Sequence, residues 1–126
     1  MIFTWKQGLI WVSAEIVYEG VSVTISDCII DTGSATTALD IDLVNFNYKK
    51  HAVIRRLTGI GGGTQEVLSQ KIDTLILDNY FLHGISIEFG DISGNFGING
   101  FIGNDILSNF NFTVNSSDHT IFFEPL

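Results

Sequence analysis

The stretch Cys28-Ile29-Ile30-Asp31-Thr32-Gly33-Ser34-Ala35 places one carboxylate directly after a short apolar strand and before a glycine turn. A second triplet of two apolar residues and a glycine, Phe101-Ile102-Gly103, follows far downstream. A hydroxyl group, together with backbone amides that glycine allows to approach closely, can hold a carboxylate at a strand end. The pattern therefore predicts that Asp31 is an exposed acid with a restricted position.

Apolar and polar residues alternate along most of the chain, which is typical of half-buried β-strands. Helical patterns are scarce: a weak turn is expected over 40–46, and one short helix over 104–110, where an asparagine can cap the first turn. The fold class is therefore predicted to be all-β, a sheet closed on itself into a barrel. The expected hairpins span residues 9–26, 72–89 around a turn at 78–79, and 112–123 around a turn at 116–118.

The order of these features resembles the retropepsin-like aspartic proteases over most of the chain. In that family a first hairpin leads into Asp-Thr-Gly, a glycine-rich flap hairpin follows, and a hydrophobic-hydrophobic-Gly triplet precedes a short helix. The corresponding segments here are 9–26, Asp31-Thr32-Gly33, 59–63 and Phe101-Ile102-Gly103. The resemblance implies a closed retropepsin-like barrel with a flap hairpin, and endopeptidase activity on an extended peptide.

Composition limits the possible classes independently. A chain of 126 residues with 45% hydrophobic residues is one domain, residues 1–126, with a core small enough for oligomerisation to help it. A net charge of -8 argues against nucleic acid as a partner. The sequence contains no apolar run long enough to span a bilayer and no signal-peptide pattern at Met1, so no membrane partner is expected. Cys28 is the single cysteine, which suits a reducing compartment, and we expect a soluble, cytoplasmic protein in which Cys28 is a core residue.

Peptide hydrolysis of this kind needs two carboxylates that share one proton, because one group must activate water while the other polarises the carbonyl. The sequence contains a single Asp-Thr-Gly, at Asp31; Asp73-Thr74-Leu75 lacks the glycine. The second carboxylate must then come from another copy of the chain, with both Asp31 side chains at the axis of a homodimer. The apolar chain ends are expected to hold this dimer together.

By resemblance, the residues around Asp31 have matching roles. Thr32 would make crossed hydrogen bonds between subunits, and Gly33 would offer its backbone amide to the two carboxylates. Ser34 would donate its hydroxyl proton to the outer oxygen of Asp31 and so lower the pKa of the pair. Ile102 and Gly103 would support the active-site loop from the downstream triplet.

The glycine-rich segment is expected to be the flap tip, with Gly59, Ile60, Gly61 and Gly62 as substrate-binding residues and the Ile60 amide reaching a substrate carbonyl through water. A phosphate-binding loop is excluded because no Lys-Ser or Lys-Thr follows. The three histidines lack partners at metal-ligand spacing, so neither a metal nor another cofactor is expected.

Viral members of the family carry an aspartate four residues after the catalytic one and an arginine just after the downstream glycine. Here those positions are Ala35 and Asn104. An alternative function therefore stays open, a catalytically silent dimer of the same fold that binds peptides or scaffolds a partner. A β-barrel subunit of a larger complex is a further alternative. A basic cluster over 49–56 would either steer an acidic substrate or be a solvated strand edge.

Overall fold

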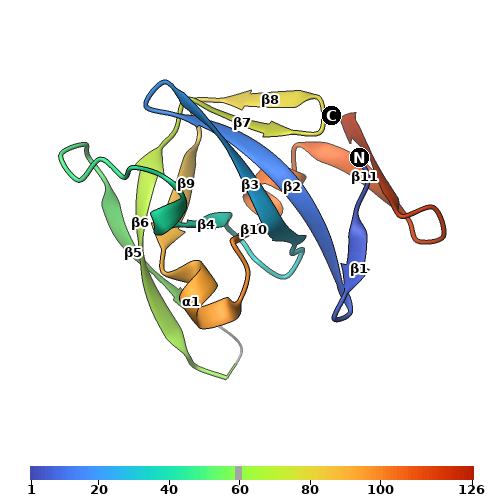
Figure 1. Ribbon diagram of the computed structural model, residues 1–126, viewed down its shortest axis with the longest axis horizontal. Coiled ribbons are helices and arrows are strands. Elements are labelled where there is room, and N and C mark those ends of the chain that lie inside the picture. The colour runs from blue at the N-terminus through green and yellow to red at the C-terminus, as the bar shows by residue number, and fades with distance from the viewer. Residues whose placement is uncertain (59–60) are drawn as a thin grey trace.

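The computed structural model describes residues 1–58 and 61–126 and is mostly β (Figure 1). Within these residues one ten-stranded sheet follows the order β5-β6-β9-β4-β10-β3-β2-β7-β8, with β1 paired to β2, and a separate two-stranded sheet is formed by β11 and β12. The elements are β1 (Thr4–Lys6), β2 (Leu9–Tyr18), β3 (Val21–Ile30), β4 (Ala38–Asp40), η1 (Ile41–Leu43), β5 (Val53–Thr58), β6 (Thr64–Lys71), β7 (Thr74–Leu77), β8 (Tyr80–His83), β9 (Ser86–Gly90), α1 (Ile92–Phe96), β10 (Gly100–Ile102), α2 (Asn104–Leu107), β11 (Phe110–Asn115) and β12 (Thr120–Pro125).

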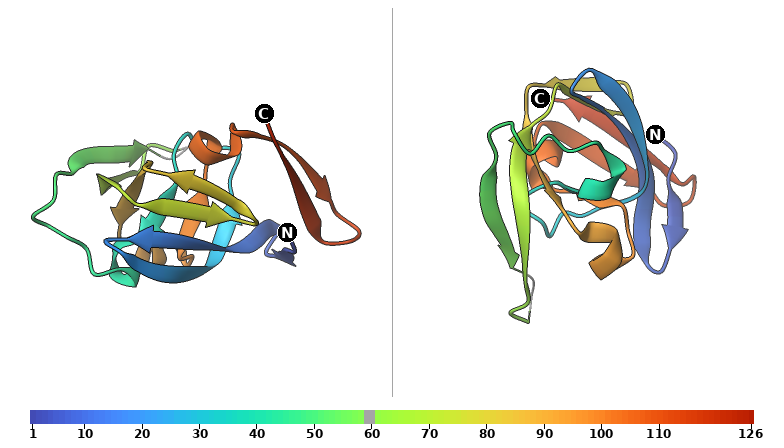
Figure 2. Two further views of the ribbon diagram at one scale, coloured as in Figure 1. Left: turned by 90° about the horizontal axis from the view of Figure 1, so that it is seen from above. Right: turned by 60° about the vertical axis from the view of Figure 1, so that its left-hand side comes forward.

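The sheet is therefore an open path in the described part of the chain, since β5 and β8 stand at its two ends. The expected closure into a barrel stays a prediction, whereas the mostly β architecture is confirmed. Figure 1 and the first view of Figure 2 place the β5–β6 hairpin at one end of the molecule and the β11–β12 hairpin at the other. The hairpin between them, β2–β3, leads directly into Asp31.

The first and last hairpins agree with the sequence pattern. Strands β2 and β3 pair antiparallel around Glu19 and Gly20, both of which adopt positive φ angles of 49° and 76°. Strand β3 continues past the predicted end at residue 26 as far as Ile30, which brings the apolar run before Asp31 into the sheet. Strands β11 and β12 pair around the predicted turn at 116–118.

The predicted hairpin over 72–89 is only half correct. Strands β7 and β8 pair around the expected turn, but β8 ends before Gly84, which adopts a left-handed φ of 62°. Strand β9 then pairs with β6 on one side and β4 on the other. The apolar alternation of 80–89 could not reveal this break, because two separate strands and one long strand share the same period.

The helix content also differs from the expectation of one short helix. Helix α2 begins at the predicted Asn104 but ends at Leu107, and a second helix, α1, precedes β10. Helix α1 ends at Gly97, where a φ of 70° stops the helix, and buries a single side chain, Ile92. So short a segment has too few turns to show a helical period in the sequence. The predicted turn over 40–46 contains the short helix η1.

Alternation along the strands separates two buried clusters on opposite faces of the sheet. On β9, Ile87 and Phe89 belong to the larger cluster, and on β4 Leu39 belongs to the same one. Ala38, the neighbour of Leu39, belongs instead to a smaller cluster on the other face. We call this smaller cluster the apolar wall; its members are Trp11, Ala38, Ile92 and Ile98, with partly buried Ile29, Leu57 and Phe101 packed against them.

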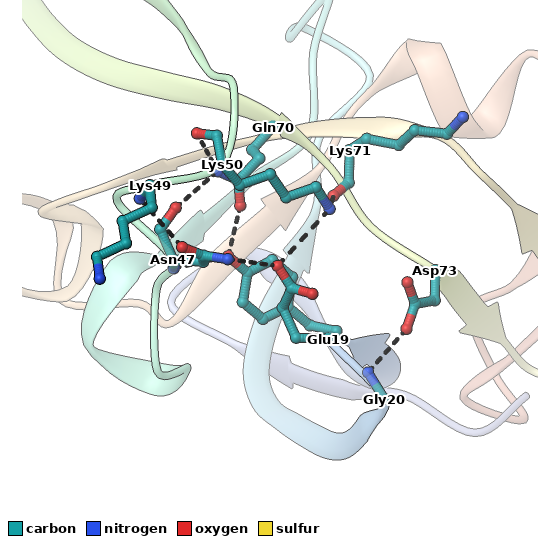
Figure 3. A network of polar contacts seen from close by, with 9 residues as sticks. Glu19, Gly20, Asn47, Lys49, Lys50, Gln70, Lys71 and Asp73 are labelled. Carbon is teal, nitrogen blue, oxygen red and sulfur yellow. Dashed lines mark hydrogen bonds and ion pairs between the residues drawn. The ribbon is translucent and has the colours of Figure 1, made fainter.

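Polar contacts hold the loop between η1 and β5 against the β2–β3 turn (Figure 3). The Asn47 amide donates to the Tyr18 hydroxyl at 2.9 Å, and Gln70 Nε2 donates to the Asn47 carbonyl at 3.0 Å. Lys50 Nζ donates to the Lys71 carbonyl at 2.7 Å and lies 4.0 Å from Glu19 Oε1. Lys50, a member of the basic cluster, therefore has a structural role in this chain.

The N-terminal residues pair with the start of β12 within one chain, and in Figure 1 both chain ends lie on the same side of the molecule. The Phe3 amide donates to the His119 carbonyl at 2.9 Å, and the Ile121 amide donates to the Met1 carbonyl at 2.7 Å. Residues 1–3 therefore cover part of the outer edge of β12. No helix in the described residues is long and apolar enough to cross a membrane.

Candidate active site

Asp31 is positioned by a parallel pair of strands that are distant in the sequence. Strand β10 pairs with β3 so that Ile102 lies opposite Ile30, and the Asp31 amide then donates to the Ile102 carbonyl at 2.9 Å. Ile102 itself is fully buried in the larger cluster. The predicted downstream triplet therefore supports the chain at the residue that carries the acid.

The carboxylate of Asp31 is half-buried and oriented by the backbone that follows it. The Gly33 amide donates to Oδ1 at 3.0 Å, and the Ser34 amide donates to the Asp31 carbonyl at 3.2 Å. A Cβ on residue 33 would lie 3.2 Å from the same Oδ1, which explains why a glycine suits this position. Donation from a backbone amide fixes the direction of the carboxylate.

The expected hydrogen bond from Ser34 to Asp31 is wrong. The Ser34 hydroxyl donates to the Thr36 carbonyl at 2.7 Å, and its oxygen accepts a longer contact from the Thr36 amide at 3.4 Å. A serine hydroxyl readily bonds a backbone group two residues away, and this local turn uses the proton that the prediction had assigned to the carboxylate. Ser34 therefore shapes the loop and does not contact the Asp31 carboxylate.

Asn104 stands at the position where the resemblance implied an arginine, and it contacts the loop that carries Asp31. Its Nδ2 donates to the Thr32 carbonyl at 2.7 Å, while its backbone amide donates to the Ser34 carbonyl at 2.8 Å. Thr32 is exposed. The neutral Asn104 side chain thus supports the loop through a hydrogen bond. An ion pair between residues 35 and 104 is not possible here, because residue 35 is an alanine.

Gly103 is the tightest point of the site. A Cβ there would lie 2.2 Å from the Thr36 carbonyl oxygen and 2.9 Å from the Ser34 carbonyl oxygen, both of them backbone atoms. The Gly103 amide donates to Thr37 Oγ1 at 3.0 Å. Only a residue without a side chain allows α2 to begin directly beneath the loop that carries Asp31.

Sequence reasoning missed a side-chain pair that joins this loop to α2. Thr37 is fully buried, and its hydroxyl donates to Asp105 Oδ1 at 2.7 Å while its amide donates to Asp105 Oδ2 at 3.0 Å. The same carboxylate accepts from the Ile106 amide at 2.9 Å, in the first turn of α2. An acid in a first helical turn was the one signal in the sequence, and it gave no indication of its distant partner.

The predicted flap corresponds to β5 and β6; β5 pairs over its whole length, from Val53 opposite Ser69 to Thr58 opposite Thr64. Two of the predicted tip residues, Gly59 and Ile60, lie outside the described residues. Gly61 and Gly62 have φ angles of 102° and 87°, a conformation that favours glycine. Near the tip, Asn95 Nδ2 of α1 donates to Gln65 Oε1 at 2.8 Å.

Cys28 is buried and its thiol is unreactive, as the sequence predicted. Burial, together with the nearby Asp27 carboxylate, raises the pKa of the thiol to about 12, so the thiolate is scarce at neutral pH. In the part of the chain that the structure describes, no group of three or more His, Cys, Asp or Glu residues could hold a metal ion. The polar groups of the candidate site are therefore a carboxylate, hydroxyls, side-chain amides and backbone amides.

The geometry around Asp31 agrees with a comparison of the sequence with known families. A family model described as retroviral aspartyl protease matches residues 6–115. The chain belongs to this family. No curated protein sequence matches the chain.

The fold is also found in a solved structure. A retropepsin-like aspartic protease from Rickettsia conorii superposes with a TM-score of 0.67 at 18% sequence identity, over 97% of this chain and 87% of that one. At that identity the match shows that the fold is retropepsin-like. Family and fold together indicate a general aspartic protease function.

Proposed function

We propose that this protein is an aspartic endopeptidase that acts as a homodimer, with Asp31 of each copy forming the catalytic pair. The single observation that carries the proposal is the position of Asp31 at the end of β3, bonded to the Ile102 carbonyl and oriented by the Gly33 amide. The sequence holds one Asp-Thr-Gly, so a second carboxylate of the same kind requires a second chain.

In the proposed reaction the two carboxylates hold one proton between them, because like charges at close range cannot both ionise cheaply; this behaviour is established for aspartic proteases as a class. The ionised Asp31 activates a water molecule, and the protonated one polarises the carbonyl of the substrate. The Gly33 amide holds the direction of the Asp31 carboxylate. Thr32 makes crossed hydrogen bonds to the partner, and Ile102 and Gly103 support the loop.

The substrate is an extended peptide that lies between the Asp31 loops and the two flaps. Gly59, Ile60, Gly61 and Gly62 would fold over it, with the Ile60 amide directed at a substrate carbonyl through water. Leu57, at the end of β5 towards the tip, packs on the apolar wall, which supports a flap that lies over the same face as Asp31. We include the cytoplasm in the proposal because the lone thiol of Cys28 suits a reducing compartment.

The dimer would form at the end of the molecule that holds both termini. Ile2, Phe122 and Leu126 are 80%, 69% and 81% exposed there, an unusual degree of exposure for large apolar side chains of adjacent segments. Because residues 1–3 cover the edge of β12 only as far as Ile121, the edge of β12 beyond it is where we place the second copy. The expectation that the apolar chain ends hold the dimer stays part of this proposal.

The test compares the wild-type protein with Asp31→Asn on a mixed peptide library, with cleavage followed by mass spectrometry. Asn is nearly isosteric with Asp but cannot take a proton, so cleavage should vanish while the circular dichroism spectrum stays unchanged. Asp42→Asn, at an exposed acid in η1, is the matched control and should cleave at the wild-type rate. Equal cleavage by wild type and Asp31→Asn would refute the assignment.

A mixing experiment tests the shared site directly. If subunits exchange, adding an equal amount of Asp31→Asn should lower the activity per wild-type chain to about half, because random pairing places half of the wild-type chains in mixed dimers. Unchanged activity after exchange would contradict a shared pair. A folded dimer that cleaves nothing would favour the alternative of a silent peptide-binding or scaffold module.

A further inference from the structure

Glu88 of β9 is a buried acid with one carboxylate oxygen, Oε2, that has no hydrogen-bond partner in the described part of the chain. The residue is only 3% exposed, and its Oε2 atom is buried with no hydrogen-bond donor there. Its backbone amide is satisfied, since it donates to the Thr37 carbonyl at 3.0 Å. Burial removes water from a carboxylate, and this cost is not offset when no hydrogen bond replaces the water. A hydrogen-bond donor from a bound molecule would offset it.

The register of the sheet places this carboxylate on the same face as Asp31. Glu88 lies opposite Ala38 on β4, Ala38 lies opposite Phe101 on β10, and Phe101 lies opposite Ile29 on β3. Directly opposed residues point to the same face, and Asp31 is two residues beyond Ile29, so it continues that face. Ala38, Phe101 and Ile29 all belong to the apolar wall, whereas the neighbours of Glu88, Ile87 and Phe89, belong to the other cluster.

The charges of two residues outside β9 affect the Glu88 carboxylate. Arg55 of β5 and Asp105 of α2 both act on its carboxylate. Asp105 is already bonded to Thr37, and the ion pairs that the described residues form, Met1 with Asp78 and Lys50 with Glu19, do not include Arg55. Arg55 is exposed on the flap hairpin and forms no ion pair with Glu88 in the described residues.

We propose that Glu88 is a specificity-determining residue of the peptide-binding face, where its carboxylate receives a lysine or arginine side chain of the substrate. This rests on the proposed function only in that the Asp31 face binds an extended peptide. The apolar wall would hold the methylene stem of such a side chain, and the carboxylate would receive its cationic head.

The position of the cationic residue in the substrate follows from the sheet. Three strand spacings separate β9 from β3, about 14 Å, and an extended peptide rises about 3.3 Å per residue. The lysine or arginine should therefore lie within roughly four residues of the bond that faces Asp31. The competing reading, in which the basic cluster attracts an acidic substrate through Arg55, predicts the opposite preference.

The experiment measures binding separately from cleavage. Octapeptides that carry lysine, norleucine or glutamate in turn at each position are titrated calorimetrically into Asp31→Asn, which binds without turnover. At one position a lysine peptide should bind at least about tenfold more tightly than its norleucine counterpart, since norleucine cannot donate a charge-assisted hydrogen bond to the carboxylate. Adding Glu88→Gln, which keeps the shape and removes the charge, should abolish that difference.

The matched control is Glu15→Gln on β2, whose side chain is half-buried and lies away from Asp31, and it should keep the lysine preference. Equal binding of lysine and norleucine peptides, a preference for glutamate, a preference that survives Glu88→Gln, or no binding by any peptide would each overturn the proposal. Lysine-selective binding by Asp31→Asn without any cleavage by the wild-type protein would support the role of Glu88 and would contradict the endopeptidase activity.

Discussion

Replacing Gly103 by alanine should be among the most damaging single-methyl additions to this chain. The added Cβ would lie 2.2 Å from the Thr36 carbonyl oxygen, about 1.2 Å inside ordinary van der Waals contact, and 2.7 Å from the carbonyl carbon. Both atoms belong to the backbone, so no side-chain rotation relieves the overlap. Either α2 or the loop that carries Asp31 must move.

The magnitude follows from two contributions. Overpacking a well-filled site costs about 1–3 kcal/mol, and movement of α2 would also stretch the hydrogen bonds from Gly103 to Thr37 Oγ1 and from Asn104 to the Ser34 carbonyl, each contributing about 1 kcal/mol. We therefore expect Gly103→Ala to lower the free energy of unfolding by roughly 3–5 kcal/mol. Cleavage should fall as well, because the same displacement moves the Asp31 carboxylate.

The assay is urea denaturation at one fixed protein concentration, because a dimer is more stable at higher concentration. It is followed by the fluorescence of the tryptophans, of which Trp11 is buried in the apolar wall. Gly63→Ala is the control, because a Cβ there meets nothing within 4 Å and the residue has no positive φ. It should change the free energy of unfolding by less than about 1 kcal/mol. A loss below about 1 kcal/mol for Gly103→Ala would refute the reasoning.

Three further changes test individual residues. Ser34→Ala should leave the pH profile of cleavage unmoved, because the hydroxyl donates to the Thr36 carbonyl; a shift towards higher pH would show that it reaches Asp31 after all. Burial, opposed by Arg55 and assisted by Asp105, raises the pKa of Glu88 above its ordinary 4.5, so the folded chain binds this proton more tightly and stability falls as the pH rises through that window. Glu88→Gln should therefore be more stable than wild type in urea at pH 7 and equal to it below pH 4.5. A constant difference between the free energies of unfolding of the two proteins at all pH values would contradict this. Phe122→Asp should give monomers without loss of the fold, which light scattering would detect; an intact dimer would place the interface elsewhere.

Local patterns in the sequence were sufficient for much of the fold. The β2–β3 and β11–β12 hairpins were predicted because alternation and turn residues act over neighbouring positions. The restriction of these patterns to neighbouring positions also explains the wrong predictions. Helix α1 is too short to show a period, and the break at Gly84 separates two strands that alternate in the same way.

The sequence by itself also determined the candidate acid, since Asp31-Thr32-Gly33 and Phe101-Ile102-Gly103 are local strings whose chemistry does not depend on distant residues. Tertiary structure alone decided what holds that acid. The parallel pairing of β3 with β10, the Thr37–Asp105 bond and the contact from Asn104 to Thr32 each join residues more than 60 positions apart. Tertiary structure also decided that Glu88 lies on the same face of the sheet as Asp31. The register between β9, β4, β10 and β3 is set by packing of the whole sheet. No local pattern encodes such a register, since a strand keeps the same alternation whichever neighbour it pairs with.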